Sequence, residues 1–175
     1  MKLLWLQHVH ISNERAIAGY VASSWVIWYI IYAMKDFLFD CIVFVPREQV
    51  LDITHDTIDV FFHQRIAELD RIPDMSTANQ YRLDSYEVFF EDIARLHDQK
   101  SMIFEWTPGT DIFECARFIS YNQELSAIVV KPYTQKGTWC KIMGIHLDDI
   151  ETIKLQDDYT MVFDEYFTKK NREEK

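Results

Sequence analysis

His55, Asp59 and His63 are the residues whose types and spacing best suit chemistry in this chain. They stand four residues apart, so on an α-helix they would form one stripe beside the apolar side chains of Phe62 and Ile66. Neutral imidazoles and a carboxylate are ligands for zinc or a related transition metal. A polar flank beside an apolar face is, however, a feature of any amphipathic helix. We therefore expect no metal site and no cofactor. Among the residues of the chain, these three are the candidates for metal ligands.

A second group of residues combines lysines with aromatic rings in the stretch 125–146, which contains no acidic residue. Its members are Lys131, Tyr133, Lys136, Trp139 and Lys141. Lysines that contact phosphates, together with rings that stack on bases, hold single-stranded nucleic acids in many proteins. The chain as a whole has a net charge of −10, from 18 basic and 28 acidic residues, which disfavours nucleic acid and anionic membrane surfaces as partners. Nucleic-acid binding through this hairpin is therefore the alternative function.

Motifs of the common enzyme classes are missing from the chain. It has no G-x-G-x-x-G, no G-x-x-x-x-G-K-[ST], no H-E-x-x-H and no G-x-S-x-G. Its three cysteines, Cys41, Cys115 and Cys140, form no C-x-x-C pair and are expected to be reduced thiols in a cytoplasmic protein. We name no catalytic residue, and the sequence favours a non-enzymatic protein.

The stretch Ala16–Met34 has no charged residue and is long enough to cross a membrane as a helix. Ser23 and Ser24 interrupt it, and the residues that follow are β-branched or aromatic, so we expect a β-hairpin instead. Both faces of its second strand are apolar and need a cover. We expect an interface there, with a second copy of the chain or with another part of it, and its residues are Trp25, Trp28, Tyr29 and Tyr32.

Hydrophobic periodicity divides the chain into β-rich ends and a helical middle. Strands are predicted at 1–11, 16–22, 25–34, 40–45, 102–106, 115–121, 125–131 and 139–145. Helices are predicted at 56–70, at 84–98 and from residue 157 or 158 onward, with a helical turn near residues 47–51. Asp148–Ile153 is predicted to be a short acidic turn.

The two β-rich ends align at an offset of 100 residues without a gap. In this alignment Phe39, Ile42, Val45 and Ile53 correspond to Trp139, Ile142, Ile145 and Ile153. The segments 39–53 and 148–153, in which a strand leads into a polar turn and then Val or Ile, resemble the end of a small SH3-like or Sm-like barrel. The resemblance implies a small antiparallel barrel in each half. It does not extend to RNA binding, because the glycine-containing signatures and the basic face of Sm-like RNA binders are missing.

We therefore predict an α+β fold with two small antiparallel β-modules, a tandem duplication, joined and covered by amphipathic helices. The modules comprise residues 1–53 and 101–175, with a helical connector at 54–100, or the three parts form one compact unit. The predicted function is a non-enzymatic protein-interaction or regulatory module in the cytoplasm. A protein partner or a second copy of the chain is expected, and neither nucleic acid nor a membrane.

Overall fold

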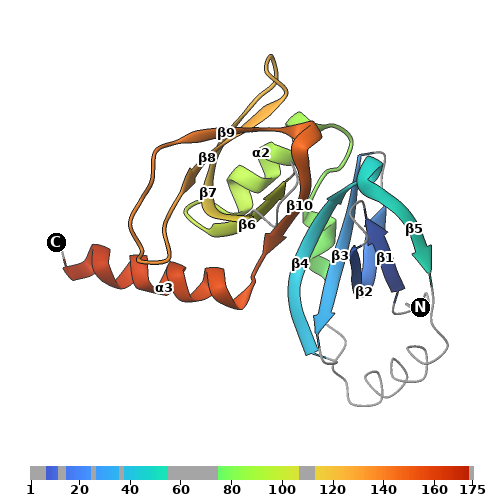
Figure 1. The fold of residues 1–175 in the computed structure, drawn as a ribbon, viewed down its shortest axis with the longest axis horizontal. Coiled ribbons are helices and arrows are strands. Elements are labelled where there is room, and N and C mark those ends of the chain that lie inside the picture. Colours follow the sequence, from blue (N-terminus) through green and yellow to red (C-terminus); the bar gives the residue numbers. More distant parts are fainter. Residues whose placement is uncertain are drawn as a thin grey trace.

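The computed structural model describes residues 7–11, 15–24, 27–35, 38–54, 75–106 and 113–173. These residues form one antiparallel sheet of ten strands with helices on both sides (Figure 1). The strands are β1 (Gln7–Ile11), β2 (Arg15–Ser24), β3 (Trp28–Lys35), β4 (Leu38–Pro46), β5 (Val50–Thr54), β6 (Ser101–Trp106), β7 (Phe113–Asn122), β8 (Ala127–Pro132), β9 (Met143–His146) and β10 (Ile150–Leu155). The helices are η1 (Arg47–Gln49), η2 (Met75–Gln80), α2 (Tyr86–Leu96), η3 (Leu147–Asp149) and α3 (Asp158–Glu173).

The predicted fold class, an α+β arrangement of two β-modules joined and covered by helices, is wrong. The strands run in a single sheet in the order β5-β1-β2-β3-β4-β10-β6-β7-β8-β9. Strand β10 makes the connection, because Ile153 is paired with Phe44 of β4 on one side and with Phe104 of β6 on the other. The local pattern of residues 148–153 indicates only a turn. In the structure just η3 is turn-like, and the residues after it form this joining strand.

One order of strands occurs twice within the sheet. In the N-terminal half (β1–β5) the order is β5-β1-β2-β3-β4, and in the C-terminal half (β6–β10) it is β10-β6-β7-β8-β9. In each half a short 3₁₀ helix, η1 or η3, links the fourth strand to the fifth. Residues 47–49 and 147–149 form these two turns, at the same offset of 100 residues as the sequence alignment.

The largest core of the protein packs around α2. Phe89, Phe90 and Ile93 of this helix are buried against Trp28 and other side chains from both halves of the sheet. The centroids of the Trp28 and Phe89 rings lie 4.8 Å apart. Figure 1 shows the strands of the C-terminal half curved around α2, so one helix fills the interior of that half and also covers the adjacent face of β3.

Smaller cores lie on the other face of the sheet. In the N-terminal half, Ile31 and Ala33 of β3 pack with Val9, Ile11 and Val43. This arrangement confirms that β3 is covered on both faces, because Trp28, Ile30 and Tyr32 belong to the core around α2. In the C-terminal half, α3 supplies the cover, and its residues Phe163 and Phe167 pack on β6, β7 and the segment after β8.

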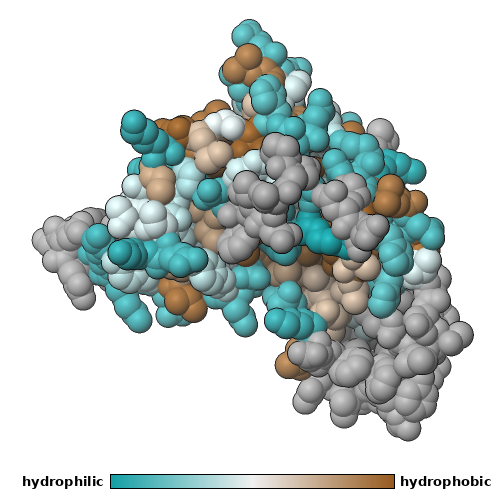
Figure 2. All heavy atoms as spheres, viewed as in Figure 1, coloured by the Kyte–Doolittle hydropathy of each residue, from teal (hydrophilic) through white to brown (hydrophobic). Residues whose placement is uncertain are grey.

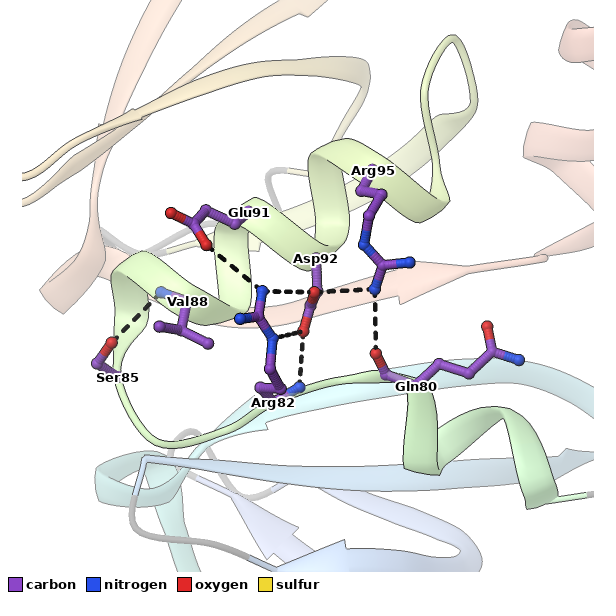
Figure 3. A network of polar contacts seen from close by, with 7 residues as sticks. All are labelled: Gln80, Arg82, Ser85, Val88, Glu91, Asp92 and Arg95. Carbon is purple, nitrogen blue, oxygen red and sulfur yellow. Dashed lines mark hydrogen bonds and ion pairs between the residues drawn. The ribbon is translucent and has the colours of Figure 1, made fainter.

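Polar contacts cap the first turn of α2 and attach the helix to the segment before it (Figure 3). Ser85 caps its first turn by accepting a hydrogen bond from the backbone N–H of Val88. Asp92 lies in the middle of the helix, is fully buried and binds both Arg82 and Arg95. Because Arg82 belongs to the segment before the helix, this carboxylate ties that segment to α2.

Strands β2 and β3 form the hairpin predicted within Ala16–Met34. Strands β2 and β3 pair in antiparallel fashion, with Tyr20 opposite Tyr32, and a bulge lies between Val21 and Ser23. None of the helices in the described ranges has the length and apolar character needed to cross a membrane. The helix predicted at 56–70 lies outside the described residues.

Candidate functional site

A cavity of about 320 Å³ opens where β4 and β6 begin and where β10 and α2 end. We call it the seam cavity, because it lies between β4 of the N-terminal half and elements that follow this half in the chain. Its wall includes Phe39, Asp40, His97, Lys100, Leu155 and Met161. A volume of this size is within the range of small-ligand sites and of pockets that receive one or two side chains of a partner.

The seam cavity continues as a groove along α3. A second hollow of about 420 Å³ is lined by Lys100, Met161 and Asp164, which also line the seam cavity, and by Glu165, Thr168 and Lys169. Together the two form what we call the seam groove. Phe39 and Met161 are apolar side chains in its wall that remain 37 % and 46 % exposed.

His97 is the titratable group of the seam cavity with the clearest change in its pKa. Burial and, to a lesser extent, Lys100 lower the pKa of His97 to about 4, so the ring is neutral at pH 7. Its Nε2 atom lies 2.6 Å from the hydroxyl of Tyr81, and the two rings are stacked. The imidazole is thus fixed in place by a neighbour from the segment before α2.

Ser101 and Asp164 fasten α3 to the sheet at the floor of the seam groove. The carboxylate of Asp164 accepts hydrogen bonds from the backbone N–H of Ser101, at 3.0 and 3.1 Å, and from its hydroxyl, at 2.7 Å. Ser101 is 3 % exposed. The pair therefore positions the helix against the first residue of β6, and the hydroxyl is engaged with a carboxylate rather than with an imidazole.

Asp40, Cys41 and Asp157 form a cluster beside the seam cavity, with one ligand atom of each within 4.8 Å of the others. The Cys41 thiol is 1 % exposed and lies 3.6 Å from an oxygen of Asp40. Burial, followed by the charge of Asp40, raises the pKa of this thiol far above its usual range. Cys41 is therefore a protonated thiol at pH 7 unless a cation displaces its proton. Sequence spacing could not reveal this cluster, because its members come from opposite halves of the chain.

A network of charged side chains joins the two halves on the same face of the sheet as α3. Glu105 of β6 accepts hydrogen bonds of 2.6 Å from Lys154 and from Thr152, both in β10. Arg15, at the start of β2, reaches both Glu105 and the buried Glu151. Burial alone would raise the pKa of Glu105, but the hydrogen bonds from Lys154 and Thr152 outweigh it and lower that pKa.

The residues of the predicted interface lie within the chain's own core as far as the structure describes them. Trp28 is fully buried against α2, and Tyr32 is 2 % exposed and bonds through its hydroxyl to Thr77. Tyr29 is half-buried, with the Arg47 guanidinium 5.8 Å from its ring. Trp25 lies outside the described residues. One face of β3 is therefore covered by α2 and η2, and its other face packs with side chains of β1 and β4. Assembly with a second copy stays a prediction.

The structure brings three of the predicted nucleic-acid residues together. Trp139 contacts Tyr133 edge-on, with ring centroids 5.5 Å apart, and Lys131 lies 5.1 Å from its centroid. Trp139 also stacks on Phe167 at 4.5 Å, and Arg117 lies 4.8 Å from it. The indole is thus already stacked against the protein and is not a free platform for a base. Lys136 and Lys141 are exposed.

The predicted metal candidates His55, Asp59 and His63 lie outside the described residues. We found no family model, no curated protein and no solved structure that matches the chain. Function is therefore inferred from the chemistry of the seam groove and of the cluster beside it.

Proposed function

We propose that the protein is a non-enzymatic cytoplasmic interaction module that docks a basic, amphipathic segment of a partner protein in the seam groove. The observation that carries this proposal is the composition of the groove. Its apolar contacts are the partly exposed side chains of Phe39 and Met161. Four carboxylates line it, against two lysines. The carboxylates belong to Asp40, Asp158, Asp164 and Glu165.

Charge determines which partner suits this groove. With four carboxylates, two lysines and a neutral His97, the lining has an excess of two negative charges. The whole chain has the same sign, at −10. Complementary potentials speed association and exclude partners of the same charge. A segment with lysine or arginine on one side and leucine or phenylalanine on the other would satisfy both the carboxylates and the apolar side chains.

Further exposed apolar side chains lie on a different face of α3 from the residues that line the groove. Tyr159, Val162 and Tyr166 are 39 %, 67 % and 44 % exposed, and they follow one another at helical spacing. On the face drawn in Figure 2, apolar atoms form small separate patches in a largely polar surface. A partner would therefore be recognised by a few apolar anchors within a polar rim, as is usual for interfaces that form reversibly.

The test uses a synthetic peptide of alternating Lys-Lys and Leu-Leu pairs as the probe, with a Glu-for-Lys version as its control. We expect the basic peptide to shift amide resonances around Phe39, Lys100 and Met161 in an NMR titration, and the acidic one to leave them unchanged. Met161→Glu should weaken binding at least tenfold. The matched control is Leu51→Glu, at an exposed leucine of β5 far from the groove in sequence. Equal binding to both variants, or shifts spread over the whole surface, would refute the proposal.

A further inference from the structure

We infer that Asp40, Cys41 and Asp157 form a binding site for a divalent transition metal of the zinc class. Asp40 and Cys41 lie near the start of β4, and Asp157 immediately precedes α3. Their ligand atoms, two carboxylate oxygens and one thiol sulfur, all lie within 4.8 Å of one another. Asp40 belongs both to this cluster and to the lining of the seam groove, so a bound ion would also reduce the negative charge of the groove.

The spacing of the donor atoms suits a shared ion. A zinc–sulfur bond is about 2.3 Å and a zinc–oxygen bond about 2.0 Å, so tetrahedral coordination places the sulfur and the oxygen about 3.5 Å apart. The sulfur of Cys41 and the carboxylate oxygen of Asp40 are 3.6 Å apart. These two ligands therefore stand at the required separation. One oxygen of Asp157 accepts a hydrogen bond of 2.9 Å from the backbone N–H of Tyr159, so the other oxygen of that carboxylate would be the third ligand.

The charges around the cluster also favour a cation. No ion pair among the described residues includes Asp40 or Asp157. Lys154 is close enough to lower the pKa of Cys41, but its ammonium group is bound to Glu105 at 2.6 Å. Two carboxylates beside a buried thiol thus lack a positive partner of their own in this part of the chain, which a metal ion would supply.

The ligand types narrow the class of metal. A thiolate is a soft ligand that selects zinc, cobalt or ferrous iron, whereas magnesium and calcium prefer sites made of oxygen alone. Asp40 belongs to the cluster and also lines the seam cavity. Gln156 and Asp158, the neighbours of Asp157 in the sequence, line the cavity too. Of the three ligands only Asp40 lines the cavity, so an ion would approach the buried thiol from the side of this carboxylate.

Metal binding exchanges the proton of the Cys41 thiol for the metal ion. The thiol of Cys41 gives its proton to solvent, its sulfur forms the bond to the metal, and the metal loses one or more of its water ligands. One proton is released for each ion bound, so the apparent affinity should rise about tenfold for each unit of pH while the free thiol stays protonated. The bound ion would link β4 to the start of α3, and thus one half of the sheet to the other.

The test titrates metal-free protein with cobalt(II) chloride and zinc chloride. Cobalt bound to a thiolate gives a charge-transfer absorption band that cobalt bound to histidine alone does not give. This distinction matters because the chain has six histidines. We expect one equivalent of cobalt to produce the band, zinc to remove it by displacement, and zinc to raise the melting temperature.

Three variants decide where the metal binds. Cys41→Ser should abolish the band, and Asp157→Asn, which keeps the thiol, should weaken cobalt binding at least tenfold. Cys140→Ser is the matched control, because Cys140 is the exposed cysteine and lies outside the cluster, and it should leave the band unchanged. If Cys41→Ser does not fold, the result with Asp157→Asn decides alone. No band in the wild-type protein, or full affinity in Asp157→Asn, would overturn the inference.

Discussion

Arg82 holds the buried carboxylate of Asp92 through three hydrogen bonds. They come from its backbone N–H at 2.8 Å, from Nε at 3.0 Å and from Nη2 at 2.9 Å (Figure 3). Arg95 adds a fourth bond of 2.9 Å. Burial alone would raise the pKa of Asp92, but the hydrogen bonds outweigh it and hold the pKa at about 2. This buried carboxylate therefore fastens the segment before α2 to the helix. Because α2 packs against both halves of the sheet, the contact supports the whole fold.

Replacing Asp92 should therefore destabilise the whole protein. Asp92→Ala leaves Arg82 and Arg95 without their shared partner and the backbone N–H of Arg82 without an acceptor. We expect the free energy of unfolding to fall by about 1–3 kcal/mol, the cost of leaving a buried donor without its acceptor, because the two arginines are more than half exposed and can be solvated. Urea unfolding followed by circular dichroism measures the loss. The control is Glu91→Gln, because Glu91 is 61 % exposed and 3.4 Å from Arg82, and it should change stability by less than about 0.5 kcal/mol.

Stability should also fall in mild acid because of His97. Its pKa is about 4 in the folded protein and about 6.5 in an unfolded chain. Between these values the unfolded state binds a proton that the folded state does not, so stability is lost as the pH falls from about 6.5 to about 4. The slope for one proton is at most about 1.4 kcal/mol per pH unit. Urea midpoints across this window should fall in the wild-type protein and fall less in His97→Gln, and equal slopes would contradict the assignment.

Trp28 should act as a core residue. Its ring lies 4.8 Å from Phe89, 5.9 Å from Tyr86 and 6.3 Å from Phe90, all in α2. Trp28→Ala should lower the free energy of unfolding by about 3–5 kcal/mol through the cavity it leaves. Leu51→Ala is the control, since that leucine is 70 % exposed and should change stability little. Light scattering of both proteins at equal concentration tests the assembly, and an altered mass in Trp28→Ala alone would show that this side chain also supports contact between copies.

Local patterns predicted most strands of this sheet but not how the sheet is joined. The hairpin of β2 and β3, the coverage of β3 on both faces and the start of α2 near residue 84 follow from residues close together in sequence. Strands β5 and β10 do not, because each is short and contains charged side chains such as Asp52 and Lys154. They are strands because they pair with β1 and with β4 and β6, and periodicity carries no information on such distant partners.

The candidate site was harder to predict for the same reason. Asp40 and Cys41 are neighbours in the sequence, but nothing in their spacing indicates that Asp157 lies beside them. The seam groove likewise exists only because β10 ends next to the start of β4. Trp28, one of the aromatic residues predicted to form an interface, is buried against α2 of its own chain. The sequence indicates that a strand needs a cover but not which element supplies it.

Two glycines in strands should respond in opposite ways to alanine. At Gly19 of β2 a Cβ atom would lie 2.5 Å from the carbonyl oxygen of Tyr32 and 3.0 Å from the Cα of Ala33, both backbone atoms of β3. Since backbone in the middle of a sheet cannot move aside cheaply, Gly19→Ala should cost about 1–3 kcal/mol of stability.

At Gly144 of β9 the nearest atom to a new Cβ, the carbonyl oxygen of Ile128, is at an ordinary contact distance of 3.8 Å. Gly144→Ala should therefore leave stability unchanged or raise it by up to about 1 kcal/mol, because alanine has less freedom than glycine in the unfolded chain. Thermal unfolding of the two variants side by side measures the difference, and a destabilised Gly144→Ala with a stable Gly19→Ala would show that the β2–β3 contact is looser than the structure has it.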